Sequence, residues 1–203
     1  MMLKQINWFA LVGGILILSL LFVSFYFPWW QLVIGDNLFK VNVSPVNTNL
    51  SFFGTQFSIP LIWAMNFASI LTFLASGIIM LIYAVKPTKS YSKDLLGFGY
   101  RTPLYAVIAC AAGLLIVTYA VKATFGINIP LMGTGTMVLP SSLTPMGISV
   151  SVIGLAGFQW PFWLAIVAAG LCIAARVYHI KLSSPPKQIL QTTANAPQIT
   201  PTI

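Results

Sequence analysis

Acidic side chains are almost missing from this chain, which has only two of them, Asp36 and Asp94, against ten lysines and arginines. Charged residues make up 6% of the sequence, whereas soluble domains carry about 25%. With 58% hydrophobic residues, this composition excludes a water-soluble single domain. The net charge of +8 does not indicate nucleic acid, because the basic residues lie at the ends of apolar runs and form no stripe interleaved with aromatic residues.

Residues for metal and redox chemistry are equally scarce. The two cysteines, Cys110 and Cys172, lie inside apolar runs and form neither a disulfide framework nor a zinc-ligand spacing. The single histidine, His179, cannot supply a bis-histidine haem. We interpret it as an interfacial residue at a helix C-terminus, with a ligand or quinone contact as the alternative. The sequence therefore predicts no catalytic residue, no cofactor-binding residue and no metal ligand.

Four long apolar runs dominate the sequence. They cover about residues 8–27, 59–85, 103–121 and 159–180. At about 1.5 Å per residue, each can cross a hydrocarbon core of about 30 Å. Pro60, Pro103 and Pro161 stand where the last three runs begin, and a first helical turn tolerates the missing N–H. We predict a membrane domain over residues 1–182 that is an all-α four-helix transmembrane bundle.

The basic segment 86–101 interrupts the apolar sequence and orients it. It carries four basic residues against Asp94, and the positive-inside rule places such a short loop in the cytoplasm. Eight basic residues then lie inside, namely Lys4, Lys86, Lys89, Lys93, Arg101, Arg176, Lys181 and Lys187. Only Lys40 and Lys122 lie outside. The prediction is a multi-pass cell-membrane protein, in contact with membrane lipid, with both termini in the cytoplasm.

Tryptophans lie near the ends of the apolar runs, where amphipathic rings anchor a span at the depth of the lipid headgroups. The predicted anchors are Trp29, Trp30, Trp63, Trp160 and Trp163.

The two outer segments, 28–58 and 122–158, contain short β-prone runs broken by Gly, Pro and Asn. The predicted strands are 31–34, 38–43, 50–59, 127–129, 136–139 and 148–153. Because isolated hairpins are marginal in water, we expect both segments to pair into one small β-rich extracytoplasmic cap. The polar, Pro-containing segment 183–203 is predicted to be a disordered cytoplasmic tail.

Small residues on the last two apolar runs predict close helix packing. The residues concerned are Ala109, Cys110, Gly113, Ala168 and Cys172. Their small-xxx-small spacing lets helix backbones approach closely, so we expect runs 103–121 and 159–180 to form the tightest pair.

Two N-glycosylation sequons, at Asn42 and Asn49, lie in the segment predicted to be outside. Pro45 follows the first of them, so Asn49 is the stronger candidate. The outer segments also hold a single acid, Asp36. So few titratable carboxylates suit an acidic exterior, and an acidophilic archaeal source is our hypothesis.

The end of the first run, Tyr26-Phe-Pro28-Trp-Trp30 and onward to Asn37, resembles the Pro-x-Trp start of the first outer segment in claudin and peripheral-myelin-protein-like tetraspans. Four spans, inner termini and β-prone outer loops are also similar to that architecture. The Gly-Leu-Trp motif and the paired cysteines of the family are absent here. The resemblance implies a fold of four helices with an outer sheet.

The functional prediction is a non-catalytic membrane protein that acts as an accessory or structural subunit or as a surface assembly component. Its partners would be other membrane or surface proteins, including further copies of itself. The alternative is a small subunit of a respiratory or other energy-converting complex that contributes to a quinone or cofactor pocket near His179. A pore for a neutral solute is less favoured, because the spans contain so few polar residues.

Overall fold

The structure is a computed structural model that describes residues 6–35, 38–57, 59–87, 91–139 and 149–183. It contains four helices, α1 (Trp8–Tyr26), α2 (Pro60–Val85), α3 (Ser92–Phe125) and α4 (Trp160–Ser183). Each is long and apolar enough to cross a membrane. The six strands are β1 (Trp30–Ile34), β2 (Phe39–Val43), β3 (Asn49–Phe52), β4 (Thr55–Phe57), β5 (Gly133–Leu139) and β6 (Val150–Phe158).

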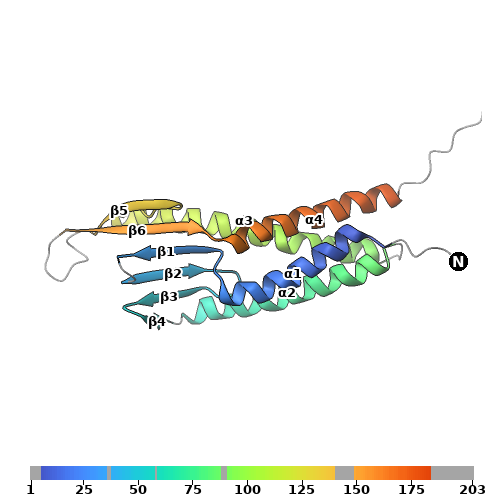
Figure 1. The fold of residues 1–203 in the computed structure, drawn as a ribbon, viewed down its shortest axis with the longest axis horizontal. Helices are drawn as coiled ribbons and strands as arrows, with labels where there is room; N and C mark the ends of the chain where they lie inside the picture. The colour runs from blue at the N-terminus through green and yellow to red at the C-terminus, as the bar shows by residue number, and fades with distance from the viewer. Residues whose placement is uncertain (1–5, 36–37, 58, 88–90, 140–148, 184–203) are drawn as a thin grey trace, which may run out of the picture.

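The molecule is elongated, with the sheet at one end and the helices extending away from it (Figure 1). The start of α1 and the end of α4 both lie at the end opposite the sheet. Helices α1, α2 and α4 begin and end close to the predicted runs, and Pro60 and Pro161 lie in first turns as predicted.

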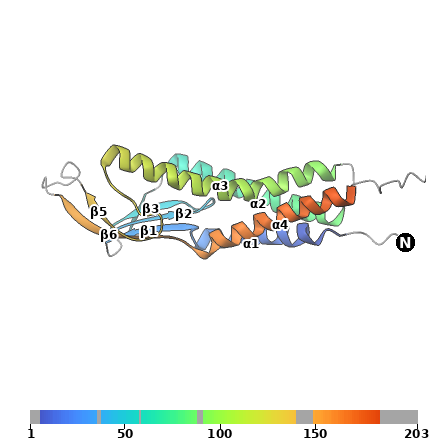
Figure 2. The ribbon, with the colours of Figure 1, turned by 90° about the horizontal axis from the view of Figure 1, so that it is seen from above.

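The start predicted for the third helix is wrong. Helix α3 begins at Ser92, so most of segment 86–101 is helical and Pro103 lies inside the helix. Its 34 residues span about 51 Å at about 1.5 Å per residue. Helix α3 therefore continues beyond the bundle and lies over the sheet, as Figure 2 shows. It ends at Gly126, whose φ of 71° is the left-handed conformation usual at helix C-termini.

The two outer segments pair into one antiparallel sheet, as predicted. Its strand order is β4-β3-β2-β1-β6-β5. The two segments join where β1 pairs with β6, with Trp30 opposite Phe158 and Ile34 opposite Gly154. The predicted run 50–59 is instead a tight hairpin of β3 and β4, in which Phe53 and Gly54 form the turn with positive φ.

The strand predicted at 127–129 is wrong, because these residues form an irregular connection. Half-buried Ile127 and Ile129 pack against the cluster between α3 and the sheet, and that packing accounts for their apolar character. Lys4, Asp36, Lys89, Ile148 and the predicted tail 184–203 lie outside the described residues, and Ser183 is the last residue of α4.

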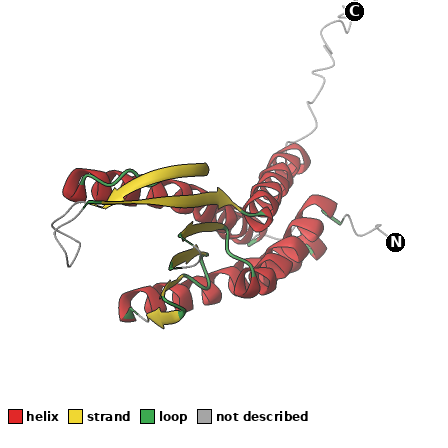
Figure 3. Ribbon diagram, turned by 60° about the vertical axis from the view of Figure 1, so that its left-hand side comes forward, coloured by secondary structure: helices red, strands yellow, loops and turns green. Residues whose placement is uncertain are grey.

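The core has two parts. One lies among the helices and includes Ile17, Met80, Tyr83 and Cys172. The other lies between α3 and the sheet and is formed by Trp30, Leu32, Leu114, Met137 and Ala156. Figure 3 shows α2 and α3 diverging towards the sheet, which lies between them.

The prediction that the third and fourth helices form the tightest pair is wrong, because α1 and α2 make the most extensive helix contact. Two glycines bring these helices together. A Cβ added at Gly77 would lie 2.5 Å from the Leu18 Cδ2, and one added at Gly14 would lie 3.2 Å from the Gly77 carbonyl oxygen. Glycine on both helices favours this close approach.

Candidate functional site

Polar side chains fix the sheet to the helices. Ser24 at the end of α1 accepts a hydrogen bond from Trp29 Nε1 at 2.8 Å, and its carbonyl accepts one from Ser44 Oγ at 3.0 Å. On α2, Asn66 accepts from the Thr48 N–H at 3.3 Å and donates to the Thr48 carbonyl at 3.4 Å. The sheet is therefore attached to the helices at several points.

Two of the predicted membrane anchors are core residues instead. Trp29 and Trp30 are 0% and 3% exposed, so neither ring can lie among lipid headgroups. Trp30 Nε1 donates to the Leu131 carbonyl at 2.8 Å and so ties the first outer segment to the second. The other predicted anchors, Trp63, Trp160 and Trp163, are at least half exposed and stay available for that role.

The sheet face that points away from α3 has a polar half and a mixed half that carries three exposed apolar side chains. In the polar half, Gln31 donates to Asn42 at 2.7 Å, and Asn42 donates to Asn49 at 3.1 Å. Both sequon asparagines are therefore half-buried members of a chain of amides. In the mixed half, on β5 and β6, the side chains of Val138, Ile153 and Leu155 are 55%, 66% and 55% exposed. Each stands opposite an exposed hydroxyl residue on the neighbouring strand, namely Ser151, Thr136 and Thr134.

The predicted packing residues separate into two groups. Ala168 and Cys172 are fully buried, and Cys172 Sγ lies 3.0 Å from the position of a Cβ on Gly13 of α1. On α3, Gly113 has open space where a Cβ would stand, and Ala109 and Cys110 line a groove. The small residues of α4 thus pack against α1, whereas Ala109 and Cys110 of α3 border a groove.

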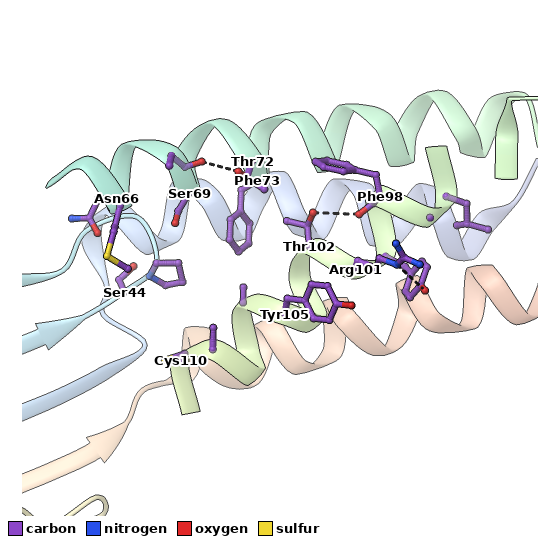
Figure 4. Close-up of a pocket in the computed structure, with 18 of the residues that line it drawn as sticks. Ser44, Asn66, Ser69, Thr72, Phe73, Phe98, Arg101, Thr102, Tyr105 and Cys110 are labelled. Carbon is purple, nitrogen blue, oxygen red and sulfur yellow. Dashed lines mark hydrogen bonds between the residues drawn. The ribbon is translucent and has the colours of Figure 1, made fainter. Parts of the chain in front are cut away.

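This groove lies mainly between α2 and α3 and has a volume of about 1460 Å³. Its walls are Ile62, Met65, Ser69, Thr72 and Phe73 of α2 and Tyr105, Ala106, Ala109 and Cys110 of α3. Figure 4 shows Ser69 and Phe73 entering it from α2, with Tyr105 and Cys110 on the α3 side. One end reaches Ser44 and Thr48 near the sheet, and the other reaches Arg176 and His179 on α4.

Two arginines meet at the groove end farthest from the sheet. Arg176 Nη1 and Arg101 Nε both donate to the Tyr100 hydroxyl, the latter at 3.3 Å. Their guanidinium carbons lie 4.4 Å and 5.8 Å from the centre of the Tyr100 ring. Lys93 and Asp94 also line this end. Sequence reasoning missed the cluster because it assigned residues 86–101 to a loop, whereas helix α3 places Tyr100 and Arg101 against α4.

A metal centre finds no support within the described ranges, where no three His, Cys, Asp or Glu side chains gather. Neither a protein-family model nor a curated protein matches the sequence.

Proposed function

We propose that this chain is a non-catalytic, multi-pass protein of the cell membrane that uses its sheet to bind another protein. It crosses the membrane four times, with the sheet outside and both termini in the cytoplasm. It acts as an accessory or structural subunit, or as a component of a surface assembly. Partners of this kind are other membrane or surface proteins, including a second copy of the chain.

The observation that carries this proposal is the set of three exposed apolar side chains on the β5–β6 part of the sheet face. Val138, Ile153 and Leu155 stand on adjoining strands among Thr134, Thr136 and Ser151. A water-facing sheet ordinarily places polar residues at such exposed positions. The other half of the face follows that ordinary pattern with Gln31, Asn42 and Asn49. Strand β5 adds an edge that pairs on one side only, which another strand could extend.

The proposed orientation is supported by the distribution of charge. Lys86, Lys93, Arg101 and Arg176 lie towards the helix ends remote from the sheet, as the positive-inside rule requires of a cytoplasmic side.

The experiment compares two double variants in native membranes. Ile153→Asn with Leu155→Asn removes apolar contact area from the sheet face, whereas Thr55→Ser with Gln56→Ser changes exposed residues on distant β4. After chemical crosslinking and mild-detergent purification, mass spectrometry identifies the bound protein. We expect the first pair to lose the crosslinked partner and the second to keep it. Unchanged crosslinking in the first pair would contradict the proposal.

A second candidate function is favoured by the groove beside His179 and Tyr100. In that case the chain is a small subunit of a respiratory or other energy-converting complex that helps to form a quinone or cofactor pocket. The test is an absorbance spectrum and an organic extract of the purified native complex. A bound quinone or haem together with oxidase subunits would support this candidate, and a colourless extract without quinone would remove it.

A further inference from the structure

We infer that the groove between α2 and α3 binds an anionic membrane lipid, with the phosphate of its headgroup held by Arg101 and Arg176. The inference rests on the proposed membrane topology, but it does not depend on the assembly role of the sheet.

The charges at the groove end call for an anion. Two guanidinium groups converge on the Tyr100 hydroxyl, and Lys93 lines the same end. Asp94 is the only acidic side chain in the described part of the chain, and neither arginine forms a salt bridge within that part. Like charges so close together repel, and a bound phosphate would offset that repulsion by accepting hydrogen bonds from both.

The phenol of Tyr100 holds this arrangement in place. Arg176 comes from α4 and Arg101 from α3, and each both bonds the Tyr100 hydroxyl and lies near its ring. Because Tyr100 uses its oxygen as the shared acceptor, the remaining guanidinium N–H groups are available for a ligand. Both arginines are exposed, so a headgroup can reach them from the membrane surface.

The rest of the groove suits an apolar chain. Beyond Arg101 it extends along α3 to Cys110, which is about 14 Å at about 1.5 Å per residue. One leaflet of the hydrocarbon core is about 15 Å thick, so this length holds most of an acyl or isoprenoid chain. Its walls there include Phe73, Ala106 and Ala109. The groove thus has cationic side chains at one end and an apolar wall beyond them. This arrangement matches a lipid, which has an anionic headgroup followed by an apolar chain.

The test measures lipid binding to the purified full chain in mild detergent by native mass spectrometry, with phosphatidylglycerol and phosphatidylcholine as probes. We expect phosphatidylglycerol to bind about tenfold more tightly than phosphatidylcholine, and this preference to disappear in Arg101→Gln with Arg176→Gln. Lys40→Gln with Lys122→Gln removes the same charge outside the groove and should keep the preference. Equal binding of the two lipids to the native chain would overturn the inference.

A second pair of variants tests the apolar part. Ala109→Phe fills the groove and should weaken both lipids, whereas Ile108→Phe changes the neighbouring exposed residue, which does not line the groove, and should weaken neither. If inorganic phosphate competes fully and Ala109→Phe has no effect, the arginines bind a free anion and the lipid assignment fails. A quinone found in the groove in place of the lipid would also overturn it.

If the variant with both arginines replaced does not fold, a salt titration of the native chain takes its place as the test. In the native chain, raising the salt from about 0.05 to about 0.5 M should weaken only phosphatidylglycerol, and equal weakening of both lipids would refute the inference.

Discussion

The hydroxyl of Ser76 on α2 donates a hydrogen bond to the carbonyl oxygen of Gly99 on α3, at 3.0 Å. Gly99 stands four residues before Pro103, so its carbonyl is the one that the proline deprives of an N–H partner within the helix. Ser76 is fully buried and supplies the missing donor from the neighbouring helix. This pairing lets α3 continue through a proline that sequence reasoning placed at its start.

Ser76→Ala should therefore lower the free energy of unfolding by about 1–2 kcal/mol, because it leaves a buried carbonyl without a donor. Pro103→Ala restores the N–H, so the cost of Ser76→Ala should fall towards zero in that background. Unfolding in detergent of the native chain, both single variants and the double variant measures this coupling. An equal cost in both backgrounds would refute the role assigned to Ser76.

Asn7 joins three helices at the end of the bundle remote from the sheet. Its side chain caps α1 by accepting from the Ala10 N–H at 3.2 Å, and it donates to the Tyr83 hydroxyl at 3.1 Å and to the Ala175 carbonyl at 3.2 Å. The residue is fully buried, and loss of its amide would leave polar groups on all three helices unpaired.

We predict that Asn7→Ala destabilises the fold by about 2–4 kcal/mol, as the sum of a lost cap and unpaired buried groups. Tyr83→Phe, which removes one hydroxyl, should cost about 1 kcal/mol. Ser19→Ala, at an exposed position of α1, serves as the control and should stay within about 0.5 kcal/mol of the native chain. The measurement is thermal unfolding of the variants in detergent. A loss of stability in Ser19→Ala as large as that in Asn7→Ala would contradict this account.

Two helical glycines provide a matched test of the packing. Gly77→Leu should destabilise the bundle by about 2 kcal/mol or more, because its side chain would collide with Leu18. Gly113→Leu meets open space, so it should be close to neutral. Thermal unfolding of the two variants side by side gives the comparison, and a larger effect at Gly113 would mean that α3 packs differently.

The scarcity of acids predicts resistance to low pH. Acid unfolding comes mostly from protonating carboxylates that are paired in the folded state, and this chain has only Asp36 and Asp94. Asp94 is exposed and forms no salt bridge within the described residues. We expect the unfolding temperature to change by less than about 3 °C between neutral pH and about pH 3. A collapse of the unfolding transition in this interval would remove the hypothesis of an acidic exterior.

Much of the architecture could be predicted from the sequence, because apolar runs bounded by tryptophan, proline and lysine mark helix ends well. The joining of both outer segments into one sheet followed from the weakness of isolated hairpins. The start of α3 could not be predicted, since a polar, basic stretch with an interior proline is typical of a loop. The buried Ser76 hydroxyl, 27 positions before Pro103, is no part of that pattern, yet it supplies the donor that the helical alternative lacks.

The candidate sites were harder to predict because they depend on contacts between distant segments. Trp29 and Trp30 carry the pattern of membrane anchors, yet their N–H groups find Ser24 and Leu131 inside the protein. The arginine cluster forms because α3 and α4 bring Arg101 and Arg176 to the same side chain, Tyr100. Arg176 lies 76 residues from Tyr100 in the sequence. Charge patterning indicated a cytoplasmic surface there but gave no sign of a groove.

Impermeant-maleimide labelling of intact cells tests the central claim, a four-span chain with its sheet outside, most directly. In a chain with Cys110→Ser and Cys172→Ser, single cysteines replace exposed Thr55 on β4 or exposed Tyr91 before α3. The account predicts labelling of Thr55→Cys in intact cells and of Tyr91→Cys only after the membrane is permeabilised. Labelling of Tyr91→Cys in intact cells, with Thr55→Cys protected, would contradict it.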